Sequence, residues 1–224
     1  MIACNRNTYP IAFFLIFLSI TILFVRGAYS QIITKYWFNG KIKFEGTYKN
    51  GMRTGTHTYW YINGQKEIET NYVNDTLHGK VTGWYKNGQI EFFGDMIKNL
   101  KHGKWQYYYK NGKPMARQFY VLGVRDDYWY LWYKNGAMKE KGYYVKGKIE
   151  GTWTSWYDNK QKKEEGQSID GQKHGVWTEW YRNGNKKQEA EYSYGELIAP
   201  VKKWWSNGRP DEPEDAFHRN RERD

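Results

Sequence analysis

Aromatic side chains and Asn-Gly turns alternate along the chain at a fixed interval of 24 residues. Two aromatics come just before each turn, and short stretches of mixed apolar and polar residues separate one turn from the next. The turns share a single phase: Asn39-Gly40, Asn63-Gly64, Asn87-Gly88, Asn111-Gly112, Asn135-Gly136, Asn159-Lys160, Asn183-Gly184 and Asn207-Gly208. A period of this length is typical of stacked supersecondary units. The sequence therefore predicts an array of repeats and no enclosed globular core.

The residues around each turn predict β-strands. Rings suit a pleated strand, and Asn-Gly between such residues favours a tight type I′ hairpin, which needs positive φ at both central positions. The aromatic column is Trp60, Trp84, Tyr108, Trp132, Trp156, Trp180 and Trp204. The predicted structural turn glycines are Gly40, Gly64, Gly88, Gly112, Gly136, Gly184 and Gly208.

A second turn falls halfway through each unit, for example at residues 49–55 and 146–151, and its spread-out glycines predict a longer loop. Each period then reads as strand, tight turn, strand, looser turn. The predicted fold is all-β, an elongated antiparallel meander of hairpin repeats over residues 31–208, with seven full periods and a closing half repeat. Almost no helix is expected within it.

Aromatics occupy both faces of the predicted sheet. Side chains alternate along a strand, so Trp153 and Tyr157 share one face while Thr154 and Trp156 share the other. The rings either pack on one another and supply stability, or stack on the sugar rings of a glycan. A single-layer sheet has few other sources of burial, which favours the structural role.

Two segments carry a family resemblance: Gly103 to Gly112, GKWQYYYKNG, and His174 to Gly184, HGVWTEWYRNG. They resemble MORN repeats, most closely the variant found in bacterial YwqK-family antitoxin proteins. The resemblance covers about residues 33–208 and implies an elongated hairpin array that binds proteins or membranes, without catalytic residues. The chain departs from the pattern at Lys160 and Gln118, where glycines are usual, and at Asp127 in a second turn.

The N-terminus predicts export. An apolar run from Ile11 to Val25 follows Arg6, and Ala28-Tyr29-Ser30 offers a cleavage site before Gln31. Residues 1–30 are therefore interpreted as a signal peptide with a hydrophobic helix, or alternatively as an N-terminal membrane anchor, although the run is short of the ~20 residues of a spanning helix. The expected location is periplasmic, cell-surface or secreted. Cleavage would remove Cys4, the sole cysteine, and with it disulfide chemistry.

The chain is basic, with a formal net charge of +11. Part of this charge forms a row of candidate anion-binding residues just before the turn asparagines: Lys86, Lys110, Lys134 and Arg182, interrupted by Asp158. The row could attract anionic lipid or cell-wall polymer. Alternatively, charged turns keep a two-sided aromatic ribbon soluble. Nucleic acid is not an expected partner of an exported protein.

No catalytic, metal or cofactor site is predicted. His78, His102 and His174 recur at one repeat position, but equivalent positions in adjacent repeats lie roughly 10 Å apart, too far to share an ion. Acidic pairs such as Glu164-Glu165 point to opposite faces of a strand. No nucleophile elbow or phosphate loop is present.

The predicted function is that of a non-enzymatic exported scaffold or antitoxin-like partner of another protein. The alternative is a module that binds anionic membrane lipid or cell-wall glycan through the basic tips and aromatic columns. Residues 209–224 mix prolines, acids and arginines without a strand pattern, and we expect a charged, flexible tail.

Overall fold

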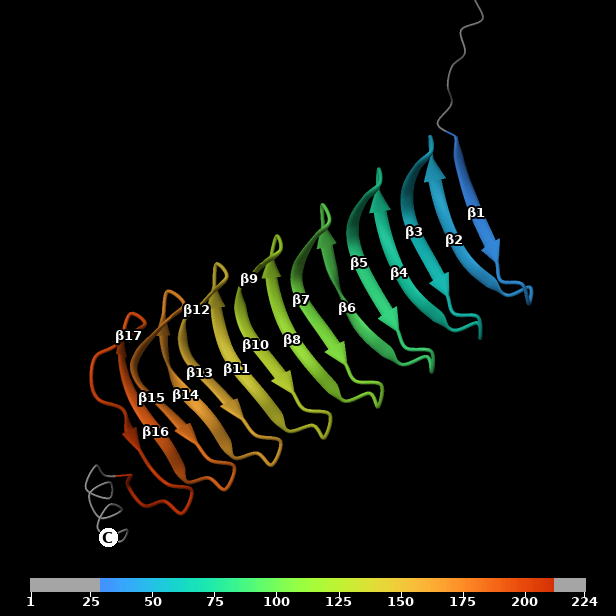
Figure 1. The fold of residues 1–224 in the computed structure, drawn as a ribbon. Coiled ribbons are helices and arrows are strands. Elements are labelled where there is room, and N and C mark those ends of the chain that lie inside the picture. The colour runs from blue at the N-terminus through green and yellow to red at the C-terminus, as the bar shows by residue number, and fades with distance from the viewer. Residues whose placement is uncertain (1–28, 212–224) are drawn as a thin grey trace, which may run out of the picture.

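The computed structural model describes residues 29–211, which form one antiparallel sheet (Figure 1). The predicted all-β meander is confirmed, and no residue of this range is helical. The N-terminal signal helix or anchor and most of the predicted flexible tail lie outside the described residues. No helix in the described range is long and apolar enough to cross a membrane.

Strands follow one another across the sheet in chain order, and most pair with the next. Three two-residue strands, Val124–Arg125, Lys148–Ile149 and Glu196–Leu197, pair only with the strand before them. The first half contains β1 Ser30–Tyr36, β2 Ile42–Lys49, β3 Met52–Trp60, β4 Lys66–Val73, β5 Thr76–Trp84, β6 Ile90–Ile97, β7 Leu100–Tyr108, β8 Pro114–Val121 and β9 Val124–Arg125. The second half contains β10 Asp127–Trp132, β11 Met138–Val145, β12 Lys148–Ile149, β13 Gly151–Trp156, β14 Lys162–Ile169, β15 Gln172–Trp180, β16 Lys186–Ser193, β17 Glu196–Leu197 and β18 Lys202–Lys203.

The predicted types of the two turns are wrong, because the structure exchanges them. At Asn39-Gly40 the loop has three residues, since the Gly40 amide donates to the Trp37 carbonyl at 2.9 Å and the Trp37 amide to the Lys41 carbonyl at 2.7 Å. Only Gly40 has positive φ there, at 79°. This is a type I turn closed by a glycine bulge, a second hairpin solution that also uses Asn-Gly.

The tight type I′ turn lies at the other end of the strands. Asn50 and Gly51 both have positive φ, 52° and 80°, and Lys49 pairs directly with Met52. The further glycine at Gly55, which made this turn look longer, lies in a bulge where β2 and β3 change register. Asn-Gly alone therefore does not separate the two hairpin types.

The buried part of the sheet is a column of tryptophans laid over glycines of the preceding strand. A Cβ added to Gly94 would lie 2.4 Å from the Trp105 ring, and one added to Gly166 would lie 2.2 Å from the Trp177 ring. The two indoles are only 4% and 6% exposed. Glycine is required here because any side chain would occupy the space of the ring.

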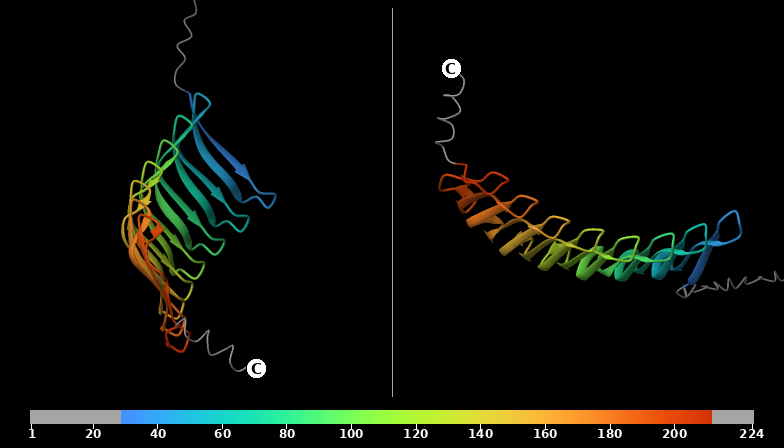
Figure 2. Two further views of the ribbon diagram at one scale, coloured as in Figure 1. Left: turned by 60° about the vertical axis from the view of Figure 1, so that its left-hand side comes forward. Right: turned by 90° about the horizontal axis from the view of Figure 1, so that it is seen from below.

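The face that holds this column is called the indole face below, and the opposite one the threonine face. The sheet is one layer thick and bows along its length (Figure 2). Both faces are consequently open to solvent over most of their area. Within residues 29–211, a binding surface has to lie on a face or along a row of turns, because the described sheet has no second layer to enclose a cleft.

Packing around Trp129 differs from that of the other indoles, because Gln118 stands where Trp129 would need a glycine. The Asp126 amide donates to the Phe119 carbonyl at 3.0 Å, the position that accepts an indole N–H from Trp105 and Trp177, and the Glu150 amide makes the same bond to Tyr143 at 2.9 Å one repeat later. The Trp129 Nε1 atom is buried without a hydrogen-bond partner among the described residues. Asp127, the first residue of β10, adopts positive φ, 64°. The departures from the repeat pattern thus coincide with a local change of packing.

Candidate functional surface

Tyrosine hydroxyls connect successive three-residue loops. Each hydroxyl donates to the backbone carbonyl 23 residues further along, as Tyr109 does to Trp132 at 2.7 Å. The same bond is made by Tyr61, Tyr85, Tyr133, Tyr157 and Tyr181, at 2.7–2.9 Å. Burial raises the pKa of Tyr61, Tyr85 and Tyr133, which keeps these donors protonated. The second ring of each aromatic pair is therefore part of the scaffold.

Asparagines form a parallel ladder beside the tyrosines. The Asn63 side-chain amide donates to the Lys86 carbonyl at 2.8 Å, and its Oδ1 accepts from the Gln65 amide at 3.1 Å. The same inter-repeat bond is made by Asn39, Asn87, Asn111, Asn135, Asn159 and Asn183. The asparagine thus closes its own loop and binds the following one, which accounts for its regular recurrence.

The aromatic column predicted from Trp60 to Trp204 is half-buried at the bulge beside these loops. Lysines of the neighbouring hairpin lie over several of its rings, with Lys66 Nζ 5.4 Å from the centre of Trp84 and Lys162 Nζ 5.6 Å from that of Trp180. Lys186 Nζ lies 5.5 Å from the centre of Trp204. These rings already have a cationic partner from their own chain.

The candidate anion-binding residues lie at the tips of the three-residue loops. Lys86, Lys110 and Lys134 are exposed in successive repeats. Arg182 is exposed as well, but it forms an ion pair with Asp158. Only the first three keep an uncompensated charge among the described residues, and their role in anion binding stays a prediction.

A second set of cations escaped the sequence reasoning. On the indole face Lys101 Nζ lies 4.5 Å from the ring centre of Trp105 and 5.2 Å from that of Tyr120. Arg125 lies 4.2 Å from the centre of Trp129 and Lys173 4.0 Å from that of Trp177. The 24-residue spacing from Lys101 to Arg125 could have revealed this column. These cations cover the buried indoles and stabilise the core.

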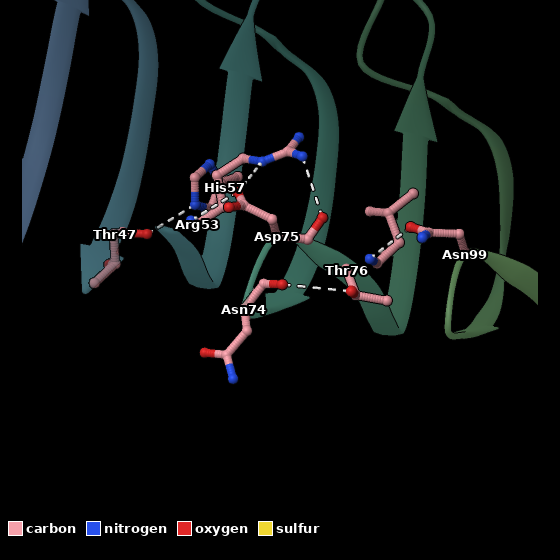
Figure 3. A network of polar contacts seen from close by, with 8 residues as sticks. Thr47, Arg53, His57, Asn74, Asp75, Thr76 and Asn99 are labelled. Carbon is pink, nitrogen blue, oxygen red and sulfur yellow. Dashed lines mark hydrogen bonds and ion pairs between the residues drawn. The ribbon is translucent and has the colours of Figure 1, made fainter. Parts of the chain in front are cut away.

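Arg53 occupies the same repeat position near the N-terminal end of the array (Figure 3). Its Nε donates to Asp75 at 2.9 Å, and its guanidinium lies 4.2 Å from the centre of the Tyr72 ring. The hydrogen bond from Arg53 holds the pKa of Asp75 below its ordinary value. His57, beside them, is 0% exposed and occupies the position that Trp105 and Trp177 hold in later repeats. The ion pair between Arg53 and Asp75 joins two adjacent type I′ turns.

The histidine row shows no metal geometry. No cluster of three or more ligating side chains occurs within residues 29–211. His102 Nδ1 lies 3.5 Å from the Leu122 amide, and His174 packs against Tyr194 with ring centres 5.0 Å apart. Both histidines shape turns, each next to a glycine of a bulge.

The threonine face carries one row of directly paired residues that crosses the whole sheet. From the N-terminal end it reads Thr34, Glu45, Thr58, Glu69 and Thr82, and toward the C-terminal end it reads Thr154, Glu165, Thr178 and Glu189. Between these two arms the row changes to Phe93, Gln106, Arg117, Tyr130 and Lys141. The alternation of threonine and glutamate therefore fails at the middle of the array, and again at its C-terminal end, where Lys202 stands opposite Glu189.

The neighbouring positions change in the same place. Polar pairs such as Thr56–Asn71 and Thr152–Gln167 are hydrogen-bonded across their strands at 2.9 Å. The middle repeat has Tyr128 opposite Tyr143 instead, with ring centres 4.9 Å apart. We define the central patch as Arg117, Phe119, Tyr128, Tyr130, Lys141 and Tyr143, on β8, β10 and β11. Sequence reasoning missed this patch because it compared what the repeats share and not where one repeat differs.

These features define a class of protein, a single-layer β-repeat array whose recurring residues are occupied in holding neighbouring repeats together. The model of the MORN repeat variant matches residues 32–50, 53–74, 77–92, 101–121, 149–170 and 173–194, more than half of the chain. The chain belongs to this family, a non-catalytic repeat family whose members commonly act as binding modules. No curated protein matches the chain. The unmatched stretch between residues 121 and 149 contains most of the central patch.

Proposed function

We propose that this protein is an exported, non-enzymatic scaffold that binds another protein on the threonine face of its sheet. The observation that carries the proposal is the central patch, where rings and an arginine replace the threonines and glutamates that build the same sheet elsewhere. Tyrosine, tryptophan and arginine are the residue types that dominate the energetics of protein interfaces. An inhibitor-like, antitoxin-like role toward one exported partner would use the same surface.

We also propose that the protein has no catalytic activity. A single-layer sheet cannot exclude water from a reacting group, and the recurring side chains already have partners in the ladders. The apolar stretch at residues 11–25 supports export.

Crosslinking in the native envelope tests this proposal. The protein, carrying a photoreactive residue in place of Val176 on the threonine face outside the central patch, is expected to yield one discrete adduct with an envelope protein. Mass spectrometry of the mature chain is expected to find Gln31 as its first residue. A protein that stays in the cytoplasm with Met1 intact, or that gives no adduct, contradicts the proposal.

The second candidate function is binding of anionic lipid or cell-wall polymer through the exposed tips Lys86, Lys110 and Lys134. Equal spacing along one row of turns favours it, since such a row could follow a charged surface. Sedimentation with anionic vesicles or cell walls separates the two functions. A polyanion binder pellets at low salt and is released as ionic strength rises, whereas the scaffold stays in the supernatant.

A further inference from the structure

We infer that the central patch is the docking site for an acidic, partly apolar segment of a protein partner, with carboxylates at Arg117 and Lys141 and an apolar side chain against Tyr128 and Tyr130. The inference rests on the proposed function and names the chemistry that its surface recognises.

The ordinary repeats show that the fold does not need these residues. On the outer strands the equivalents of Arg117 and Lys141 are the glutamates Glu45, Glu69, Glu165 and Glu189. The last three form ion pairs with lysines three positions earlier: Lys66–Glu69, Lys162–Glu165 and Lys186–Glu189. In the two middle repeats both positions of this pair hold other residues. Pro114 and Met138 replace the lysine, and Arg117 and Lys141 replace the glutamate. In each of two adjacent repeats the neutralising pair is thus replaced by a cation that lies near a ring and has no carboxylate partner among residues 29–211: Arg117 is 6.0 Å from the ring centre of Trp132, and Lys141 is 6.0 Å from that of Tyr128.

The two cations flank one ring. Tyr130 pairs with Arg117 on one side and with Lys141 on the other, so the cations lie two strand spacings apart, roughly 10 Å. Both are exposed, and neither has a carboxylate within ion-pair distance among residues 29–211. An arginine in this setting can hold a carboxylate through two parallel hydrogen bonds.

Rings beside the cations supply an apolar surface. Tyr128, Tyr130 and Trp132 stack successively along β10, with ring centres 5.8 Å and 5.9 Å apart. Tyr128 is 49% exposed and Tyr143 37% exposed. Val121 and Val145 extend the apolar area toward the type I′ turns, at 41% and 40% exposure. The threonines and glutamates on either side form a polar rim, as at the margin of a protein interface.

This combination favours a peptide over other anions. A polysaccharide or a phosphate backbone would satisfy the two cations but has no apolar side chains for Phe119, Val121 and Tyr143. A lipid surface would meet the charged loop tips before it met the middle of a sheet face. An acidic segment with interspersed apolar residues matches both the charge and the rings.

The ordinary repeats of the chain indicate which variant tests the inference. The triple change R117E/Y130T/K141E restores the glutamates and threonine of the ordinary repeats, so the sheet keeps a pattern it already uses. The variant K86E/K110E is the control, because it changes the net charge by the same amount at the loop tips. The probe is a soluble random copolymer of glutamate and tyrosine, and its binding to full-length protein is measured by fluorescence anisotropy.

We expect the wild-type protein and K86E/K110E to bind the copolymer with similar Kd and the triple variant at least 10-fold more weakly, with thermal unfolding midpoints preserved. Lack of copolymer binding by the wild type, equal binding by the triple variant, or an equal loss in K86E/K110E would overturn the inference. So would patch-dependent binding of anionic vesicles or heparin in preference to the copolymer. The scaffold function stands apart from this result, because it survives if the wild-type protein still crosslinks to one envelope protein.

Discussion

His57 and Thr47 are joined by the same hydrogen bond that tryptophans make elsewhere in the array. The His57 Nε2 atom lies 2.9 Å from the Thr47 carbonyl oxygen (Figure 3), while the indole N–H groups of Trp105 and Trp177 donate to the equivalent carbonyls at 3.1 Å and 2.8 Å. A carbonyl oxygen can only accept, so Nε2 is the donor in this bond, and Nδ1 is buried without a hydrogen-bond partner. The imidazole therefore acts as a small replacement for an indole.

Replacing His57 with alanine should destabilise the array by about 2–4 kcal/mol, because it leaves a cavity between Phe44, Tyr48 and Tyr72 and an unpaired Thr47 carbonyl. Urea denaturation followed by tryptophan fluorescence measures the loss. His78→Ala is the control, since His78 is exposed, and it should change stability by less than ~0.5 kcal/mol. Equal effects of the two changes would show that His57 does not contribute to the core.

Removing one hydroxyl from the tyrosine ladder should cost about 0.5–1.5 kcal/mol, the net value of a typical hydrogen bond. Tyr109→Phe deletes the bond to the Trp132 carbonyl and keeps the ring. Thermal unfolding measured by circular dichroism reports the change. Tyr36→Phe serves for comparison, because Tyr36 is 62% exposed and stands on β1 before the ladder begins. A variant as stable as the wild type would mean that water satisfies the carbonyl equally well.

Lys160→Gly should stabilise the protein by about 1 kcal/mol. Lys160 holds φ at 72° in the loop position that glycine occupies in the other repeats, and a left-handed backbone strains a residue that has a Cβ. The reverse change, Gly136→Lys, should destabilise by a similar amount, since Gly136 has φ of 95°. Differential scanning calorimetry of both variants checks the pair, and shifts of the same sign would contradict the prediction.

The ion pair between Arg53 and Asp75 makes a prediction about pH. Its hydrogen bond places the pKa of Asp75 below the ordinary 3.8, so the folded state binds a proton at Asp75 less readily than the unfolded chain. The stabilising contribution is therefore present above pH 3.8 and is lost as pH falls through the lowered folded pKa. Carboxyl NMR titration should give Asp75 a lower pKa in the wild type than in Arg53→Gln. Identical titration curves in the two proteins would rule out the effect of Arg53.

The sequence predicts the architecture well because the repeats amplify a weak local signal. One Asn-Gly is ambiguous, but eight turns in phase flanked by paired rings define the meander and its repeat length. The same signal misassigned the turn types, since Asn-Gly suits a type I′ turn and also a three-residue loop in which only glycine is left-handed. Hydrogen bonds such as that between the Gly40 amide and the Trp37 carbonyl resolve the ambiguity, and they follow from strand register.

The candidate site was harder to predict for a related reason. Lys86 and its equivalents were visible because they recur, whereas Arg117, Tyr130 and Lys141 lie 11 to 13 residues apart and become neighbours only through pairing of β8, β10 and β11. To recognise them, one must know which residues of adjacent strands are paired. The structure gives this strand register, and the register shows that the Thr–Glu row changes at the middle of the array.

The pairing of each strand with its neighbours alone also determines where the sheet begins to unfold. Each strand is held only by the strands beside it, so thermal opening starts at β1 or at the short strands β17 and β18 and proceeds inward. Arg117, Tyr130 and Lys141 lie several hairpins from either end. Fraying that releases the first or last repeat leaves their spacing intact, and a partner could therefore be held by a protein whose ends are already partly unfolded.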